Sequence, residues 1–153
     1  MVTLVVLGPA VLDGWGVGRF YLIHLACGVA GNWVSYLLSP TPAVKAGASG
    51  SILGLLGALA GARIRSIRRE RRPSRFKTWH IVAMLVAFYG FVIGVGDVDH
   101  LAHLGGLLAG VLLAFLLPQR GQLVSRTDRL VDRTLGALAV ALAAASALLA
   151  YRG

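Results

Sequence analysis

The sequence predicts an all-α, polytopic transmembrane helical bundle, and three observations lead to this prediction. Residues of the types AVILMFWYC make up 57% of the 153-residue chain, and a further 20 residues are glycine. Charged residues make up only 14%, and the mean hydropathy is +0.76. A water-soluble domain has to present a polar exterior, and so few charged side chains do not supply one. The third observation is that the charges lie between long apolar segments.

Five stretches of the chain contain no charged residue, and each is long enough to cross a bilayer as a helix. At a rise of about 1.5 Å per residue, stretches of this size reach roughly 25 to 30 Å, which is the thickness of the hydrocarbon layer. The second stretch is the shortest, with 17 residues, and we expect it to begin below the membrane surface. The five stretches are residues 20–39, 46–62, 78–96, 100–118 and 134–151.

The basic residues predict which loops face the cytoplasm. Residues 63–77 carry eight Lys and Arg side chains and residues 119–133 carry four, so both segments are predicted to be cytoplasmic. Two spans separate these loops, which places them on one side as the charge rule requires. The net charge of +9 is therefore explained by topology and not by nucleic-acid binding, and loop 63–77 is expected to contact anionic lipid. We predict a multi-pass integral membrane protein, in the plasma membrane.

This topology gives four parts along the chain. Residues 1–12 are predicted to be the remnant of a transmembrane helix, interrupted at Gly8-Pro9; residues 13–119 form a core with four spans. Residues 120–133 are a basic cytoplasmic loop, and residues 134–153 form an additional carboxyl-terminal span. The topology would bury a charged amino terminus in the membrane. We therefore expect a longer protein, or a start codon assigned too late; an amino-terminal segment lying flat at the interface is the alternative.

Polar side chains inside spans are costly and are therefore candidates for function. Ser49 lies 14 residues before Arg63, and His103 lies 15 residues before Pro118. Both side chains are thus expected about 21 to 23 Å above the cytoplasmic boundary, on two spans that cross in the same direction. A hydroxyl and an imidazole at one depth can form the minimum apparatus for nucleophilic acyl transfer. The polar residues weighed were His24, Asn32, Ser49, Ser51, His100 and His103.

Stripes of small residues predict that these two spans pack closely. One span carries Gly50, Gly54, Gly57 and Gly61 at helical spacing, and the other carries His103, Gly106, Gly110 and Ala114. Small residues allow transmembrane backbones to approach each other. A glycine-packed structural bundle with incidental polar residues is the alternative interpretation. The single cysteine excludes a disulfide, the histidines are scattered, and we expect neither a metal nor a cofactor.

Three motifs, spread over residues 4–119, resemble the rhomboid intramembrane serine proteases. The segment Gly47-Ala48-Ser49-Gly50, followed by residues 52–58, is similar to the serine-bearing helix of that family. Ala102-His103-Leu104-Gly105-Gly106 with Gly110 is similar to its histidine-bearing helix, and Gly28, Gly31, Asn32 and Ser35 resemble the span before the serine. The position occupied by Leu53 is often aromatic in the family and stacked near the histidine.

The resemblance implies a rhomboid-like core over residues 13–119 and a protease that cleaves transmembrane segments of membrane proteins. Ser49 would be the nucleophile and His103 the general base, with no carboxylate required, and Ser51 would not replace Ser49. Backbone support for the oxyanion would come from Ser49, Gly47 and Gly50, and helix packing near the site from Gly54, Gly57, Gly106 and Gly110. A catalytically silent relative that binds transmembrane clients is the alternative function.

Asp99 is a further candidate for the site. Asp99 lies four residues before His103 on the same helical face, where it would orient the imidazole as a third member of a triad. The alternative is a solvated turn that Asp99 shares with Asp97.

Overall fold

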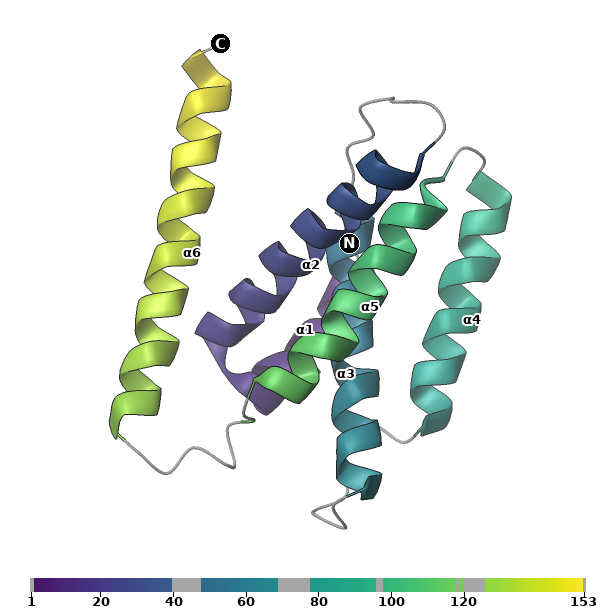
Figure 1. The fold of residues 1–153 in the computed structure, drawn as a ribbon, viewed down its shortest axis with the longest axis horizontal. Helices are drawn as coiled ribbons and strands as arrows, with labels where there is room; N and C mark the ends of the chain where they lie inside the picture. The colour runs from purple at the N-terminus through teal and green to yellow at the C-terminus, as the bar shows by residue number, and fades with distance from the viewer. Residues whose placement is uncertain are drawn as a thin grey trace.

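In the part of the chain that it describes, the computed structural model is a bundle of six α-helices, and the prediction of an all-α fold is confirmed (Figure 1). The structure describes residues 2–39, 48–68, 78–95, 98–117, 119 and 126–152, and none of these residues belongs to a β-strand. The helices are α1 (Val2–Trp15), α2 (Val17–Leu38), α3 (Ser49–Arg68), α4 (Thr78–Val95), α5 (His100–Leu116) and α6 (Arg126–Arg152).

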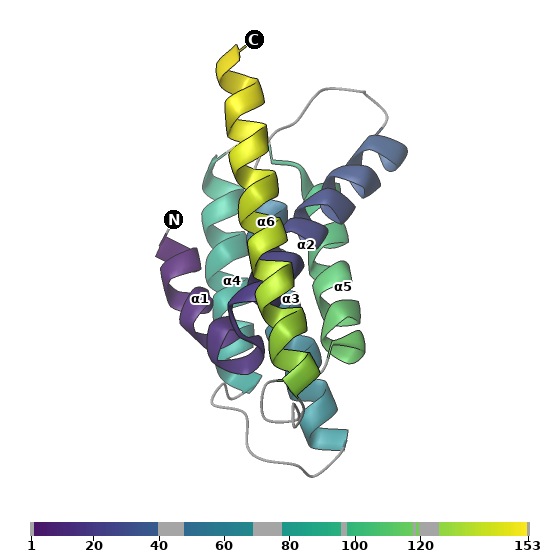
Figure 2. The same cartoon turned by 90° about the vertical axis from the view of Figure 1, so that its left-hand side faces the viewer.

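Helices α3 and α5 form the centre of the bundle, and α2 packs against both (Figure 1). On one side of this trio, α4 contacts α3, and on the other side α6 runs beside α2. The view in Figure 2 shows α6 crossing in front of α2, with α1 on the flank nearer α4. The three central helices are therefore the framework, and α4 and α6 cover opposite sides of it.

Helices α2 to α6 follow the five apolar stretches in order, and α3 and α6 extend further at their basic ends. Helix α3 continues to Arg68, and α6 already begins at Arg126, inside the segment predicted to be a loop. An apolar stretch marks only the part of a helix that suits lipid, whereas backbone hydrogen bonding continues through arginine, which is a good helix former. The rest of the predicted loops, at 40–47, 69–77 and 120–125, lies outside the described residues.

The amino-terminal segment is a packed helix and is not interrupted at Gly8-Pro9. Helix α1 runs through Pro9, and its side chains Leu7, Val11 and Trp15, four residues apart, are fully buried against the core. A single residue, Gly16, separates α1 from α2 and has a φ of 88°. Glycine adopts this conformation without the steric penalty that other residues incur, so the reversal needs no longer loop.

The number of described helices that are long and apolar enough to cross a membrane differs from the five predicted spans. By length and composition, α2 is the one described helix that is long and apolar enough to cross a membrane by itself. Shorter apolar helices are found at Thr3–Trp15, Trp79–Gly90 and His100–Leu116. The basic residues at the end of α3 and at the start of α6 lower the hydropathy of those helices, although each contains an uncharged stretch.

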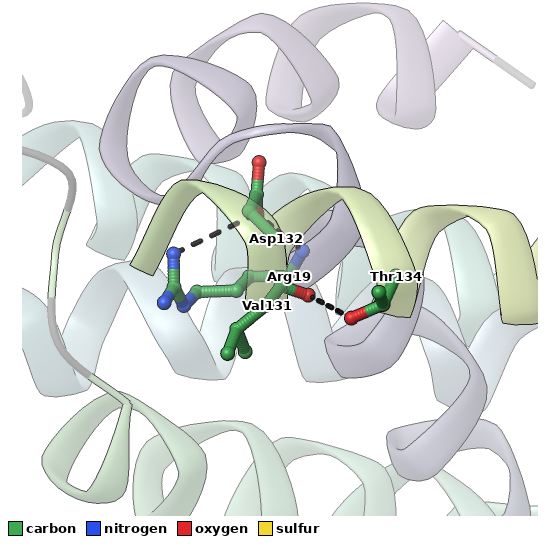
Figure 3. A network of polar contacts seen from close by, with 4 residues as sticks. All are labelled: Arg19, Val131, Asp132 and Thr134. Carbon is green, nitrogen blue, oxygen red and sulfur yellow. Dashed lines mark hydrogen bonds and ion pairs between the residues drawn. The ribbon is translucent and has the colours of Figure 1, made fainter. Parts of the chain in front are cut away.

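Helix α6 is joined to the start of α2 by a partly buried ion pair (Figure 3). The backbone N–H of Arg19 donates to Asp132 Oδ1 at 3.2 Å, and Nη1 of the same arginine lies 3.6 Å from that oxygen. The arginine side chain is 3% exposed and the carboxylate 16%. A Cβ built at Gly18 would overlap the backbone of Asp132, so the two helices touch here through their main chains.

We expect the ion pair between Arg19 and Asp132 to contribute to the stability of the protein. Asp132→Ala leaves the buried guanidinium of Arg19 without its counter-charge and is expected to lower the free energy of unfolding by about 3 kcal/mol. The double variant Arg19→Met, Asp132→Leu removes both charges and should recover most of that loss. Thermal unfolding of the detergent-purified protein, followed by circular dichroism, compares the two. Equal loss in both variants would contradict a role for the unpaired charge.

Candidate active site

The main chains of α3 and α5 approach each other along a line of glycines. A Cβ built at Gly106 would overlap the backbone of Gly50, and one built at Gly110 would overlap the backbone of Gly54. On the opposite helix, a Cβ at Gly57 would overlap the carbonyl of Leu107. Side chains larger than hydrogen at these positions would force the two helices apart. The glycines expected to pack near the site thus lie between the helices that carry Ser49 and His103.

The contacts between α3 and α5 keep a nearly constant offset in sequence, which defines two parallel helices in register. Ser49 meets a residue 54 positions later, His103. At the other end, Arg65 Nη1 donates to the carbonyls of Ala114 at 3.1 Å and Leu117 at 3.2 Å, which are 49 and 52 positions later. The arginine thereby satisfies carbonyl groups that the last turn of α5 leaves without helical partners.

Ser49 and His103 lie within hydrogen-bonding distance at the upper end of this helix pair. The serine Oγ is 2.7 Å from the histidine Nε2. Ser49 is the first residue of α3 and is half-buried, whereas His103 lies in the first turn of α5 and is 1% exposed. When the hydroxyl donates to Nε2, the ring proton is on Nδ1, and this nitrogen has no hydrogen-bond partner in the described part of the chain.

An aromatic side chain from α4 packs against the imidazole. The ring centroid of Phe88 lies 5.2 Å from that of His103, with the planes at 76°, an edge-to-face arrangement. Leu53, at the position that is often aromatic in the resembled family, is 1% exposed and belongs to the apolar core. Sequence reasoning missed Phe88, because nothing in its apolar segment distinguished it from the neighbouring side chains.

The remaining polar residues of the spans lie elsewhere. Ser51 is buried, and a Cβ built at Gly28 of α2 would meet its Oγ, so this hydroxyl is directed toward α2. Asn32 and His100 are exposed, and the ring of His24 stacks on Phe20 with 6.1 Å between centroids. Gly47 lies outside the described residues. Within the described part of the chain, no cluster of three or more His, Cys, Asp or Glu side chains is arranged to hold a metal ion.

The carboxylate of Asp99 forms hydrogen bonds that differ from those of a catalytic triad, and Asp97, with which it was expected to share a turn, lies outside the described residues. Its Oδ1 accepts a hydrogen bond from the backbone N–H of Ala102 at 2.9 Å, and its Oδ2 accepts one from the hydroxyl of Ser35 on α2. The carboxylate therefore caps α5 and bonds to α2. It does not bond to Nδ1 of His103, which has no partner among the described residues.

The first turn of α3 presents backbone donors beside the serine. The N–H of Ile52 donates to the carbonyl of Ala48, the residue before the helix, at 3.1 Å. Ser49 and Gly50 are the first two residues of α3, so their N–H groups belong to the set that an α-helix leaves without helical acceptors. Such an amino terminus carries a partial positive charge that favours an anion.

Comparison with known proteins identifies the family. A rhomboid domain model matches residues 1–120. Rhomboid protease GluP of Bacillus subtilis is 37% identical over 110 residues, which cover 72% of this chain and 21% of that protein. Rhomboid-like protease 5 of Toxoplasma gondii is 38% identical over 113 residues, covering 74% of this chain and 13% of that protein. RHOMBOID-like protein 5 of Arabidopsis thaliana is 33% identical over 124 residues, covering 80% and 39%.

The chain belongs to the rhomboid family, whose members are integral membrane proteins. It spans less than half the length of each of these three relatives. None of the solved structures compared with the chain matches it significantly. Other Arabidopsis relatives are named as mitochondrial and chloroplastic, so membership of the family does not support the plasma membrane in particular as the location.

The glycine contacts predict different outcomes for the same substitution at two places. Gly106→Ala puts a methyl group into the backbone of Gly50 and should lower the free energy of unfolding by about 1 to 3 kcal/mol. Gly90→Ala in α4 meets nothing within 4 Å and serves as the matched control, with stability unchanged or raised. Thermal unfolding of both variants checks this. An equal effect at the two positions would be inconsistent with close packing of α3 against α5.

Proposed function

We propose that this chain carries the catalytic pair of an intramembrane serine endopeptidase, with Ser49 as nucleophile and His103 as general base. The observation that supports it most directly is the distance of 2.7 Å between Ser49 Oγ and His103 Nε2. A nucleophile and a base within hydrogen-bonding reach are the geometric signature of covalent acyl transfer. The substrates would be transmembrane segments of membrane proteins, as the family of the chain suggests.

The proposed reaction proceeds in two steps. Ser49 Oγ attacks a peptide carbonyl while His103 Nε2 accepts the hydroxyl proton; the imidazolium then protonates the leaving amine, which gives an acyl-enzyme. Water hydrolyses this ester, with His103 acting again as base, and the serine is regenerated. The backbone N–H groups of Ser49 and Gly50, with support from the backbone at Gly47, would stabilise the oxyanion of each tetrahedral intermediate.

The proposed topology places this chemistry toward the outer side of the membrane. Loops 63–77 and 119–133 would be cytoplasmic because of their basic residues, and loop 63–77 would contact anionic lipid. Residues 1–12 would then be part of a transmembrane helix, residues 13–119 the four-span core, and residues 134–153 an additional span after the loop 120–133. Ser49 and His103 lie at the ends of α3 and α5 away from that basic side.

Labelling with a fluorophosphonate probe tests the proposed nucleophile. The wild-type chain should be labelled, Ser49→Ala should not be labelled, and His103→Ala should react about 100- to 10,000-fold more slowly because the general base is lost. Ser51→Ala is the matched control, since this second serine of the same helix faces α2 and should leave labelling intact.

Cleavage and binding of a transmembrane substrate distinguish the protease from a catalytically silent relative. The protease predicts that wild-type protein releases product and that Ser49→Ala binds the substrate without cutting it. A wild-type chain that binds transmembrane segments but neither reacts with the probe nor cuts would show the silent relative to be the correct interpretation. Labelling that persists in Ser49→Ala and is lost in Ser51→Ala would refute the assignment of the nucleophile.

A further inference from the structure

The start of α5 is attached to α2 through one carboxylate. Asp99 is the N-cap of α5, and its Oδ1 accepts the N–H of Ala102 at 2.9 Å. Its other oxygen, Oδ2, accepts the hydroxyl of Ser35, a residue of α2 that is 8% exposed and 64 positions away in sequence. Both partners are donors, so the ionised carboxylate has its two oxygens engaged, one within α5 and one across to the neighbouring helix.

His103, the proposed general base, lies in the helical turn that Asp99 caps. The N–H of His103 donates to the main-chain carbonyl of Asp99 at 3.1 Å, so the capping residue and the histidine are linked across a single helical turn. Any shift or rotation of Asp99 relative to α2 therefore carries the imidazole with it. Because Ser49 lies 2.7 Å from Nε2, a displacement of about 1 Å would break that contact.

The glycine contacts between α3 and α5 do not by themselves fix this placement. Glycines allow the backbones to approach but provide no side chains that resist sliding or rotation of one helix over the other. Directional hydrogen bonds resist both movements. Arg65 bonds to the carbonyls of Ala114 and Leu117, 11 and 14 residues after His103, and so restrains the carboxyl end of α5 and not its first turn. At the amino end, next to His103, the restraint comes from Ser35 and Asp99.

We propose that the Ser35–Asp99 pair is a positioning device that sets the imidazole of His103 against Ser49 by fixing the first turn of α5 to α2. The pair positions the ring through the backbone of α5 and not through a hydrogen bond to it, since Nδ1 has no partner among the described residues. Asp99 is thus a positioning residue and not a third member of a triad. This inference rests on the proposed function for its kinetic consequences, but the geometry it describes can be measured without catalysis.

Rates of fluorophosphonate labelling test the kinetic consequence. Ser35→Ala and Asp99→Ala should each lower the second-order rate constant by about 100-fold, as expected when a reacting group is misplaced by about 1 Å. The double variant should be no slower than Asp99→Ala, because the two side chains act as one unit. Asp99→Asn should recover a rate near wild type, since its amide keeps an oxygen for Ala102 and gains an N–H that can donate to Ser35 Oγ.

Two control variants separate positioning from general stability. Arg65→Gln removes the hydrogen bonds at the distant end of α5 and should lower the unfolding midpoint while the labelling rate stays near wild type. Ser66→Ala removes a hydroxyl that donates within its own helix turn, to the carbonyl of Arg63 at 2.8 Å, and should change neither quantity. If Arg65→Gln slows labelling as much as Asp99→Ala does, the positioning proposal is wrong and the rate simply follows stability.

Nuclear magnetic resonance of ¹⁵N-labelled imidazole tests the geometry even in a chain that does not react. The Nε2 shift of His103 should change on Ser49→Ala in the wild-type background, because the hydrogen bond is lost. In the Ser35→Ala and Asp99→Ala backgrounds the same substitution should change nothing. The proposal would be overturned if Ser49→Ala changed the Nε2 shift in the Ser35→Ala and Asp99→Ala backgrounds as much as it does in wild type. A different outcome is also possible: the Nε2 shifts behave as expected in all backgrounds, but the wild-type chain is not labelled. That result would refute the proposed function and still support the positioning role of Ser35 and Asp99.

Discussion

The close approach of the α3 and α5 backbones is the constraint on which the rest of the structure depends. Gly50, Gly54, Gly106 and Gly110 remove the side chains that would hold the two helices apart, and a methyl group at these places would meet main-chain atoms. Inside lipid there is little hydrophobic gain from burying one apolar helix against another, so close packing itself has to supply the attraction. Ser49 and His103 meet only because the helices that carry them come this near.

Close packing brings the helices together, and separate hydrogen bonds hold each end of α5. Arg65 reaches the carbonyls at the carboxyl end, and Ser35 with Asp99 holds the amino end. Each bond also satisfies a group that the helix itself leaves unpaired or that would be costly to bury alone. The polar residues of the core are thus concentrated where helices begin and end, and the glycine line between them is apolar.

The peripheral helices are attached by different means. Helix α6 meets α2 through the pair of Arg19 and Asp132 and through main-chain contact at Gly18, far from Ser49 along the bundle. Helix α4 packs the ring of Phe88 against the ring of His103. The proposed site is therefore assembled from α3 and α5, supported from α2 at the cap of α5 and covered from α4, while α6 serves the opposite side of the framework.

The sequence alone determined the helices and the two residues proposed for chemistry. Long uncharged stretches, basic loops and the matching depths of Ser49 and His103 are all periodic or compositional features, which are written locally along the chain. Only the tertiary structure decided what Asp99 bonds to, that Phe88 covers the imidazole and that Arg19 pairs with Asp132. Those contacts join residues from different helices, and their partners depend on how each helix is rotated about its axis. Rotation follows from packing with all neighbours at once, and a single apolar segment carries no local signal for it.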